Sequence, residues 1–253
     1  MRCVSLLNTS VYLFLLAIKL VSHLLFLFIL MFGIPLMFLN ISGARWFLTF
    51  KDNCTRVTWV FLLKQKSEVS SRFIQFVSMI KNQFGVNIKR IKSDNAKDYF
   101  NLVLNSFCQK EGIIHECSCV NTPQQNGIAE RKNGHLLNQT RALLFQNYIP
   151  KKFWGEALLT ATYLINRLPS KILASKSPMN VLSSFYPHLD STNKLKPRIF
   201  GCISFVHVYS NERGKLDPRA VKCVFLGYST TQGIQMFPPP IKEILCIKGC
   251  HLQ

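Results

Sequence analysis

Two short blocks decide the fold and chemistry of this chain: Lys92-Ser93-Asp94-Asn95 and Thr122-Pro123-Gln124-Gln125-Asn126-Gly127-Ile128-Ala129-Glu130-Arg131-Lys132-Asn133. The first ends a strand-like run over residues 86–91, and the second opens a helix-like run. Thirty-five residues separate Asp94 from Glu130. A carboxylate at a strand end and another in the first turn of a helix can converge on a hard cation such as Mg²⁺, which prefers oxygen ligands. Taken alone, two such carboxylates are more often surface charge.

Four further blocks follow one another along most of the chain. They are Gly43-Ala44-Arg45-Trp46-Phe47, Asp52-Asn53-Cys54-Thr55-Arg56-Val57-Thr58-Trp59, Phe153-Trp154-Gly155-Glu156-Ala157 and Lys215-Leu216-Asp217-Pro218-Arg219-Ala220-Val221-Lys222-Cys223-Val224-Phe225-Leu226-Gly227-Tyr228. With the two blocks above, in this order, they resemble the integrase of Ty1/copia-type LTR retrotransposons. That family uses two Asp and one Glu, with thirty-five residues between the last two. Asp94 and Glu130 match its second and third members.

The resemblance implies a site and partners. Asp94 and Glu130 would be catalytic and would bind metal, and the expected cofactor is a pair of Mg²⁺ or Mn²⁺ ions that promote DNA strand transfer. The expected partners are retrotransposon DNA ends and target DNA, with homo-oligomers also possible. Residues expected to contact nucleic acid lie on both sides of Glu130 in the sequence and comprise Gln124, Gln125, Asn126, Arg131 and Lys132. We interpret His115 as structural.

Charge and cysteine content agree with a nucleic-acid partner. The chain has 253 residues and a net charge of +19, from 31 basic and 12 acidic residues. This charge indicates a polyanion, with nucleic acid first and a membrane surface second. Nine cysteines include no C-x-x-C pair, which favours thiols in a reducing compartment over a disulfide framework. We therefore expect the protein in the nucleus or cytoplasm.

Residues 11–39 are almost wholly apolar, interrupted by Lys19 and His23. At face value the run predicts a transmembrane helix, because about 20 apolar residues span a bilayer. It is too long for a signal peptide and lacks an obvious small-residue cleavage site. A third interpretation concerns the message. Codons with U in the middle all encode Phe, Leu, Ile, Met or Val, so a U-rich message translated out of frame gives this composition.

The out-of-frame interpretation accounts for both ends of the chain. Residues 29–35 can be encoded so that a neighbouring frame reads S-D-V-W-D-P, which differs in a single codon from the S-D-V-W-G-P block that carries the family's first catalytic Asp. Residues 6–19 yield the family's basic linker in the same way, and residues 232–253 yield the end of its terminal domain. We therefore expect the first metal-ligating Asp to be missing, with Leu30 and Met31 in its place.

The apolar pattern predicts an α/β fold. Strand-like runs over 45–50, 57–63, 86–93 and 113–119 combine with helical patterns over 67–84, 98–111 and 129–147. With the resemblance, this becomes an RNase H-like integrase catalytic core, a mixed sheet flanked by helices. A helix over 150–168, a linker over 170–196 and strands over 199–209 and 220–228 predict a helical extension and a small, incomplete SH3-like β-barrel.

Five segments follow from these patterns. They are an apolar segment over 1–42, the core over 43–148, the helical extension and linker over 149–196, a partial barrel over 197–231 and an aberrant tail over 232–253. The tail lacks a strand pattern, so we expect unpaired strand edges in the barrel.

Three functions stay open. The first is a degenerate integrase region that binds nucleic acid but lacks strand transfer, because a two-metal site needs a bridging carboxylate. The second is an active integrase or nuclease that uses Asp52 or Asp98 as its third carboxylate. The third is a membrane-anchored basic protein without a catalytic role. The missing first Asp favours the first of these.

Overall fold

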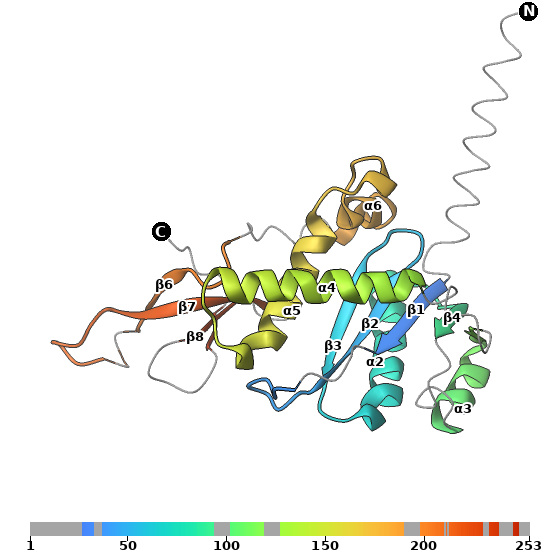
Figure 1. Cartoon of the computed structure of the whole chain (residues 1–253), viewed down its shortest axis with the longest axis horizontal. Helices are drawn as coiled ribbons and strands as arrows, with labels where there is room; N and C mark the ends of the chain where they lie inside the picture. The colour runs from blue at the N-terminus through green and yellow to red at the C-terminus, as the bar shows by residue number, and fades with distance from the viewer. Residues whose placement is uncertain are drawn as a thin grey trace, which may run out of the picture. The chain divides into compact units, whose positions relative to one another are not determined.

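The computed structural model describes residues 27–32, 37–93, 102–118, 127–189, 198–209, 211, 213–229, 233–237 and 245–247. The chain divides into two compact units. The first comprises Met1–Pro35, Trp46–Asn133 and Asn166–Ser191, and the second comprises Leu36–Arg45, Gly134–Ile165 and Thr192–Gln253. Each unit is therefore assembled from segments that are distant in the sequence (Figure 1).

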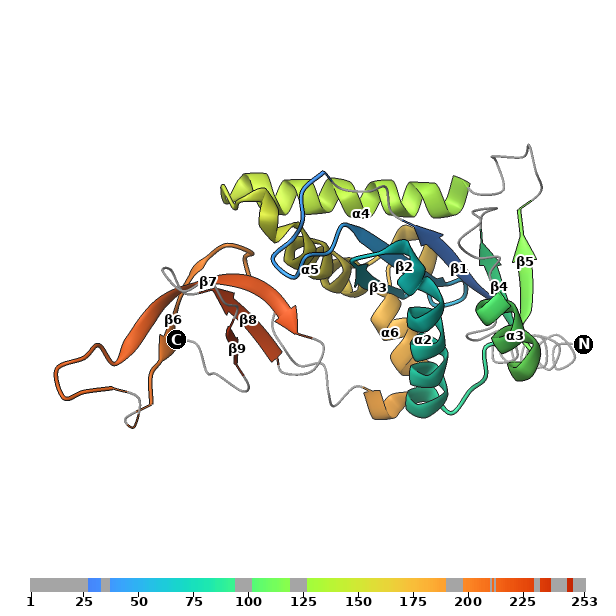
Figure 2. The same cartoon turned by 90° about the horizontal axis from the view of Figure 1, so that it is seen from below.

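A five-stranded sheet is the centre of the first unit. Its strands are β1 (Leu27–Phe32), β2 (Trp46–Asp52), β3 (Thr58–Leu63), β4 (Arg90–Ser93) and β5 (Ile114–Cys117). Their order across the sheet is β3-β2-β1-β4-β5 (Figure 2). β2 runs antiparallel to β1 and β3, whereas β4 is parallel to β1 and β5 is parallel to β4. The mixed sheet predicted from the sequence is present, with β1 in the middle.

The middle strand lies inside the apolar segment over 11–39. All six of its residues, LFILMF, are apolar, a composition typical of strands with neighbours on both sides and layers on both faces. A short apolar run cannot be separated from a buried helix by periodicity alone, which is why a helix was an open interpretation. Residues 11–26 and 33–36 of the segment lie outside the described residues. Among the described helices, none is long and apolar enough to cross a membrane.

The helix α2 (Val69–Phe84) supplies the apolar layer against the sheet. Its predicted core positions Phe73, Phe76 and Ile80 are fully buried. The ring of Phe76 stacks on Phe50 of β2 with 4.1 Å between centroids. This unit also contains α3 (Leu102–Glu111), α6 (Pro178–Phe185) and the start of α4 (Gly127–Gln146), as far as Asn133. The helical period therefore predicted both the element and the face of α2 that packs.

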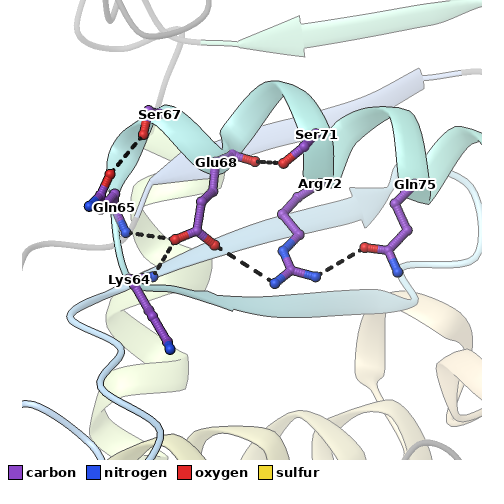
Figure 3. A network of polar contacts seen from close by, with 7 residues as sticks. All are labelled: Lys64, Gln65, Ser67, Glu68, Ser71, Arg72 and Gln75. Carbon is purple, nitrogen blue, oxygen red and sulfur yellow. Dashed lines mark hydrogen bonds and ion pairs between the residues drawn. The ribbon is translucent and has the colours of Figure 1, made fainter.

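The start of α2 is fixed by a polar network (Figure 3). A short 3₁₀ turn, Lys66–Glu68, precedes the helix. The carboxylate of Glu68 accepts hydrogen bonds from the backbone N–H groups of Lys64 (3.1 Å) and Gln65 (3.0 Å). Its other oxygen lies 3.7 Å from the Arg72 guanidinium. A carboxylate that caps free N–H groups at a helix start stabilises the helix by about 1 kcal/mol.

Helix α6 corrects the prediction of a linker over 170–196. The Ser177 hydroxyl accepts a hydrogen bond from the Asn180 N–H at 3.1 Å, and Pro178 occupies the first turn. Leu182 is buried in the core of the first unit. A Ser followed by Pro is a helix-start signal, so the sequence contained the information. The linker prediction treats Pro178 as a helix breaker, whereas Pro178 lies in the first turn of α6.

The second unit contains a four-stranded antiparallel sheet (Figure 2). Its strands, in order, are β6 (Ile203–His207), β7 (Ala220–Ser229), β8 (Gly233–Phe237) and β9 (Leu245–Ile247). β8 and β9 correct the expectation that the tail forms no strands. Met236 of β8 is fully buried with Phe225 of β7 in one cluster. Backbone pairing and one well-placed apolar side chain are sufficient to extend the sheet.

Helix α5 (Trp154–Arg167) packs against the strand β7 within the second unit. The Thr160 hydroxyl donates to the Glu156 carbonyl oxygen at 2.8 Å within the helix and lies 3.3 Å from the carbonyl oxygen of Leu226 in β7. The rings of Tyr163 and Tyr228 stack with 3.8 Å between centroids. Gly227, at φ +122°, leaves no room for a side chain, because a Cβ there would lie 2.0 Å from the Thr160 hydroxyl oxygen. The helical extension and the β-sheet therefore pack as one body.

Candidate metal and nucleic-acid site

The carboxyl end of β4 lies beside β1 at the positions where the sequence predicts that the first carboxylate is missing. In the parallel pairing, Leu30 is the register partner of Ser93. In the antiparallel pairing, Leu30 is opposite Phe50 and Met31 is opposite Thr49. Asp94 follows Ser93 directly in the sequence and lies outside the described residues, as do Gln124, Gln125, Asn126 and Asp98. The strand register thus locates positions 30 and 31 beside the end of β4.

The two faces of the sheet differ at these positions. The Thr49 hydroxyl donates to the Asn133 side-chain oxygen at 3.2 Å, and Asn133 belongs to α4 (Gly127–Gln146). Phe50 instead packs on α2. Residues opposite one another on neighbouring strands share a face. Backbone position 31 therefore belongs to the face that α4 contacts, and position 30 to the face that α2 covers.

Glu130 lies in the first turn of α4 and is exposed. It precedes Asn133 by three residues, so the two side chains lie on the same side of the helix. Because Asn133 contacts β2, Glu130 is on the side of α4 that turns toward the sheet, one helical turn nearer its amino end. The predicted third carboxylate therefore shares a sheet face with position 31.

Asp52 does not share that face. It is fully buried, and its Oδ2 accepts hydrogen bonds from the Thr55 backbone N–H (2.7 Å) and hydroxyl (2.6 Å). Burial raises the pKa of Asp52. Burial, and to a smaller extent the charge of Asp52, raises the pKa of Tyr186, whose ring lies 5.0 Å from that of Phe84 in α2. Asp52 therefore stabilises the turn after β2 on the α2 side, away from Glu130. It is unsuited to complete the site.

Four cations gather on the α4 side of β2: Lys51, Arg56, Arg131 and Lys132, here called the basic cluster. Lys51 is only 8% exposed. Burial first, and then the charges of Arg56, Lys132 and Arg131, together lower the pKa of Lys51 to about 8. Burial also lowers the pKa of Lys132 to about 8. Two predicted nucleic-acid residues, Arg131 and Lys132, are therefore brought beside two cations that the prediction did not include.

The turn between β2 and β3 holds Arg56 in place. Its backbone has φ +66°, a left-handed conformation that costs on the order of 1 kcal/mol for a residue other than glycine. The Arg56 N–H donates to the Asp52 carbonyl at 3.1 Å, and the Asn166 side chain brackets the next strand by pairing with the N–H and C=O of Thr58. A single-sequence pattern contains no signal for this proximity, because it depends on the pairing of β2 with α4.

His115 joins the ends of β4 and β5. Its Nε2 lies 2.7 Å from the Ser93 hydroxyl oxygen. Burial lowers the pKa of His115, which favours the neutral ring. This contact fixes the strand end immediately before Asp94, in agreement with a structural role.

Comparison with known proteins finds one matching family model and several related proteins. A family model described as the retroviral polymerase SH3-like domain matches residues 202–246, which include β6, β7 and β8. The chain is 36% identical over 83% of its length to the retrovirus-related Pol polyprotein from transposon TNT 1-94 of Nicotiana tabacum. It is 37% and 39% identical, over 77% of its length, to those from transposons RE2 and RE1 of Arabidopsis thaliana. The chain is homologous to the Pol polyproteins of copia-type transposons.

This homology confirms the resemblance and the SH3-like domain. It supports a role in the integrase region of a retrotransposon Pol polyprotein. The chain spans only 13–16% of the length of these relatives. The homology gives no support for the alternative of a membrane-anchored protein.

The donor set does not fit a two-metal site. Among the described residues, no three His, Cys, Asp or Glu side chains lie close enough to hold one metal ion. Leu30 and Met31 provide no oxygen ligand, which Mg²⁺ and Mn²⁺ require.

Proposed function

We propose that the first unit is an RNase H-like integrase core that binds DNA and lacks strand transfer. The sheet supports this proposal, because only β2 runs against the other four strands and β1 is central, as in RNase H-like sheets. The position of Glu130 in the first turn of α4, on the side of Asn133, supports it further.

One observation carries the loss of catalysis. The strand register sets positions 30 and 31 of β1 next to the end of β4, the strand that Asp94 follows in the sequence. The family's first Asp is expected at these two positions. A hydrocarbon and a thioether side chain there leave two carboxylates. The bridging ligand that lets two ions act on one phosphate is then missing.

Binding would be carried by the basic cluster. Burial destabilises the charged form of both lysines in the cluster, and neighbouring cations also destabilise that of Lys51. A bound phosphate would offset both effects, because its negative charge stabilises the ammonium groups. Gln124, Gln125 and Asn126, which precede α4 in the sequence, would add contacts to the DNA backbone. The partners proposed are retrotransposon DNA ends and target DNA, with Mg²⁺ or Mn²⁺ as the family's cofactor and a homo-oligomer as the acting form in the family.

The first experiment tests catalysis. Purified chain is incubated with a donor DNA end, a target plasmid and Mg²⁺ or Mn²⁺, and joined products are separated on a gel. We expect no product above a reaction without protein. Appearance of joined product would contradict the loss of catalysis.

The second experiment tests binding. Duplex DNA affinity is measured by fluorescence anisotropy across a salt series for the chain and for Lys132→Gln. We expect Lys132→Gln to bind more weakly and to reduce the salt slope by about 1, as for one lost phosphate contact. Lys110→Gln is the matched control, because Lys110 is an exposed cation of α3 that no contact relates to the basic cluster. Equal salt slopes for both variants would refute the basic cluster as the DNA site.

A further inference from the structure

Strand β6 exposes its apolar side chains and buries a polar one. Ile203 and Phe205 are 59% and 62% exposed, whereas Ser204 between them is 7% exposed. His207, the next residue on the outward face, is also exposed. A strand on a solvated sheet normally shows the opposite alternation. An exposed apolar row of this kind points to a binding surface.

The row continues onto its neighbours. In the register with β7, Phe205 is opposite the exposed Lys222 and Ile203 is opposite Val224. Beyond the end of β6, Tyr209 is 70% exposed, and its ring centroid lies 6.3 Å from that of His207. We call Ile203, Phe205, His207, Tyr209 and Lys222 the β6 outer face.

Charge identifies the kind of occupant. Between residues 198 and 229 the sequence contains five Lys and Arg residues against two acidic residues. One of the two, Asp217, uses its Oδ2 to accept a hydrogen bond from the Gly214 N–H at 2.7 Å. Lys222 and Arg219 are both exposed. The β6 outer face therefore combines aromatic and aliphatic groups with positive charge, which complements a polyanion with accessible apolar surfaces.

We propose that the β6 outer face binds unpaired nucleotides of single-stranded nucleic acid. Bases stack on Phe205 and Tyr209, and the phosphates lie against Lys222 and Arg219. Single strands offer both chemistries at once, because every unpaired base exposes a flat face next to a phosphate. A duplex hides its base faces in the stack and presents phosphates outward, so it would leave the apolar row uncovered. The proposal is independent of the missing carboxylate and of the basic cluster.

The test compares single-stranded and duplex binding by the full chain. Fluorescence anisotropy is measured with labelled oligothymidine, labelled oligouridine and a labelled duplex at one salt concentration. We expect Phe205→Ala to weaken single-strand binding on the order of 10-fold, the usual effect of losing one stacking platform, and to leave duplex binding unchanged within about 2-fold. The two single strands show whether DNA or RNA is preferred.

The matched control is Phe145→Ala in α4. Phe145 is 63% exposed and belongs to the same unit, but it is not on the β6 outer face. Because both phenylalanines are exposed, neither variant removes core packing, and thermal melting checks this. Unchanged single-strand binding by Phe205→Ala overturns the proposal. So does concentration-dependent dimerisation that Phe205→Ala abolishes, because the face would then be covered by a second copy of the chain.

Discussion

At the scale of single residues, Lys51 and Lys132 carry the clearest functional signature. Each ammonium is partly removed from water, and Lys51 also faces other cations, so the pKa of each falls to about 8. Asp52 offsets only part of this repulsion on Lys51. Perturbed cations grouped on one face are typical of binding sites for anions. Their loss of charge is also measurable.

The stability of the chain should depend on pH through Lys51. Its folded pKa of about 8 lies below the ordinary 10.5, so between these values the unfolded state binds more protons. Stability therefore rises with pH across this window. We expect urea unfolding to show a smaller rise from pH 8 to pH 10 for Lys51→Met than for the unmodified chain. Parallel pH profiles for the two proteins would show that Lys51 is not perturbed.

Bound DNA should raise the lowered pKa of Lys51. Phosphates near Lys51 favour its charged form, so binding above pH 8 is accompanied by proton uptake. Duplex affinity should then fall more steeply between pH 7.5 and 9 for the unmodified chain than for Lys51→Met, as measured by anisotropy. A steeper fall in Lys51→Met would contradict the placement of DNA at this residue.

At the residue scale, the sequence could name the candidate residues that a single motif contains. Glu130, Arg131 and Lys132 follow one another in the sequence, and helical geometry alone fixes their relative positions. Lys51 and Arg56 join them only because β2 lies under α4, through the contact of Thr49 with Asn133. Such a contact between residues 84 positions apart leaves no local pattern.

At the scale of elements, β7 approaches α5 closely in the second unit. Gly227 allows the strand to pass within hydrogen-bonding distance of Thr160. The stacked rings of Tyr163 and Tyr228 extend the same contact. Helix α5 thus packs against β7, and we expect these two elements to unfold together.

Gly227→Ala should therefore destabilise the second unit strongly. The new Cβ meets the Thr160 oxygen, and φ +122° is unfavourable for alanine, so we expect a loss of more than about 2 kcal/mol. In the Thr160→Ala background the clash is relieved, so the same substitution should cost less. Chemical denaturation of the four proteins of this cycle gives both values. An equal cost in both backgrounds would rule out the close approach as the cause.

Elements were predictable in proportion to their length and period. The helix over 67–84 showed its apolar positions at helical spacing and was found as α2. β1 is too short and too uniformly apolar to reveal its conformation, and only pairing with β2 and β4 shows that it is a strand. Residues 11–26 and 33–36 of the same apolar segment lie outside the described residues. The out-of-frame interpretation of both chain ends stays a prediction about the nucleotide sequence.

At the scale of the whole molecule, two units with different chemistry follow from one sequence. The first carries the RNase H-like sheet proposed here, the basic cluster and Glu130. The second carries the SH3-like sheet, whose β6 outer face is proposed to bind unpaired nucleotides. In both units the proposed binding groups suit nucleic acid, and the group proposed to be missing is the carboxylate that strand transfer would require. The proposed loss of strand transfer therefore depends on the side chain at position 31.

A carboxylate returned to position 31 should rebuild a metal site. The measurement is the thermal midpoint of the full chain with and without Mn²⁺, for the unmodified chain, Met31→Asp and Leu30→Asp. Met31→Asp should gain a saturable Mn²⁺-dependent stabilisation of about 1–3 kcal/mol, which a second substitution, Glu130→Gln, removes. The unmodified chain and Leu30→Asp, whose new carboxylate is on the α2 face, should show none. An equal shift in all three proteins, or a shift confined to Leu30→Asp, would contradict the account.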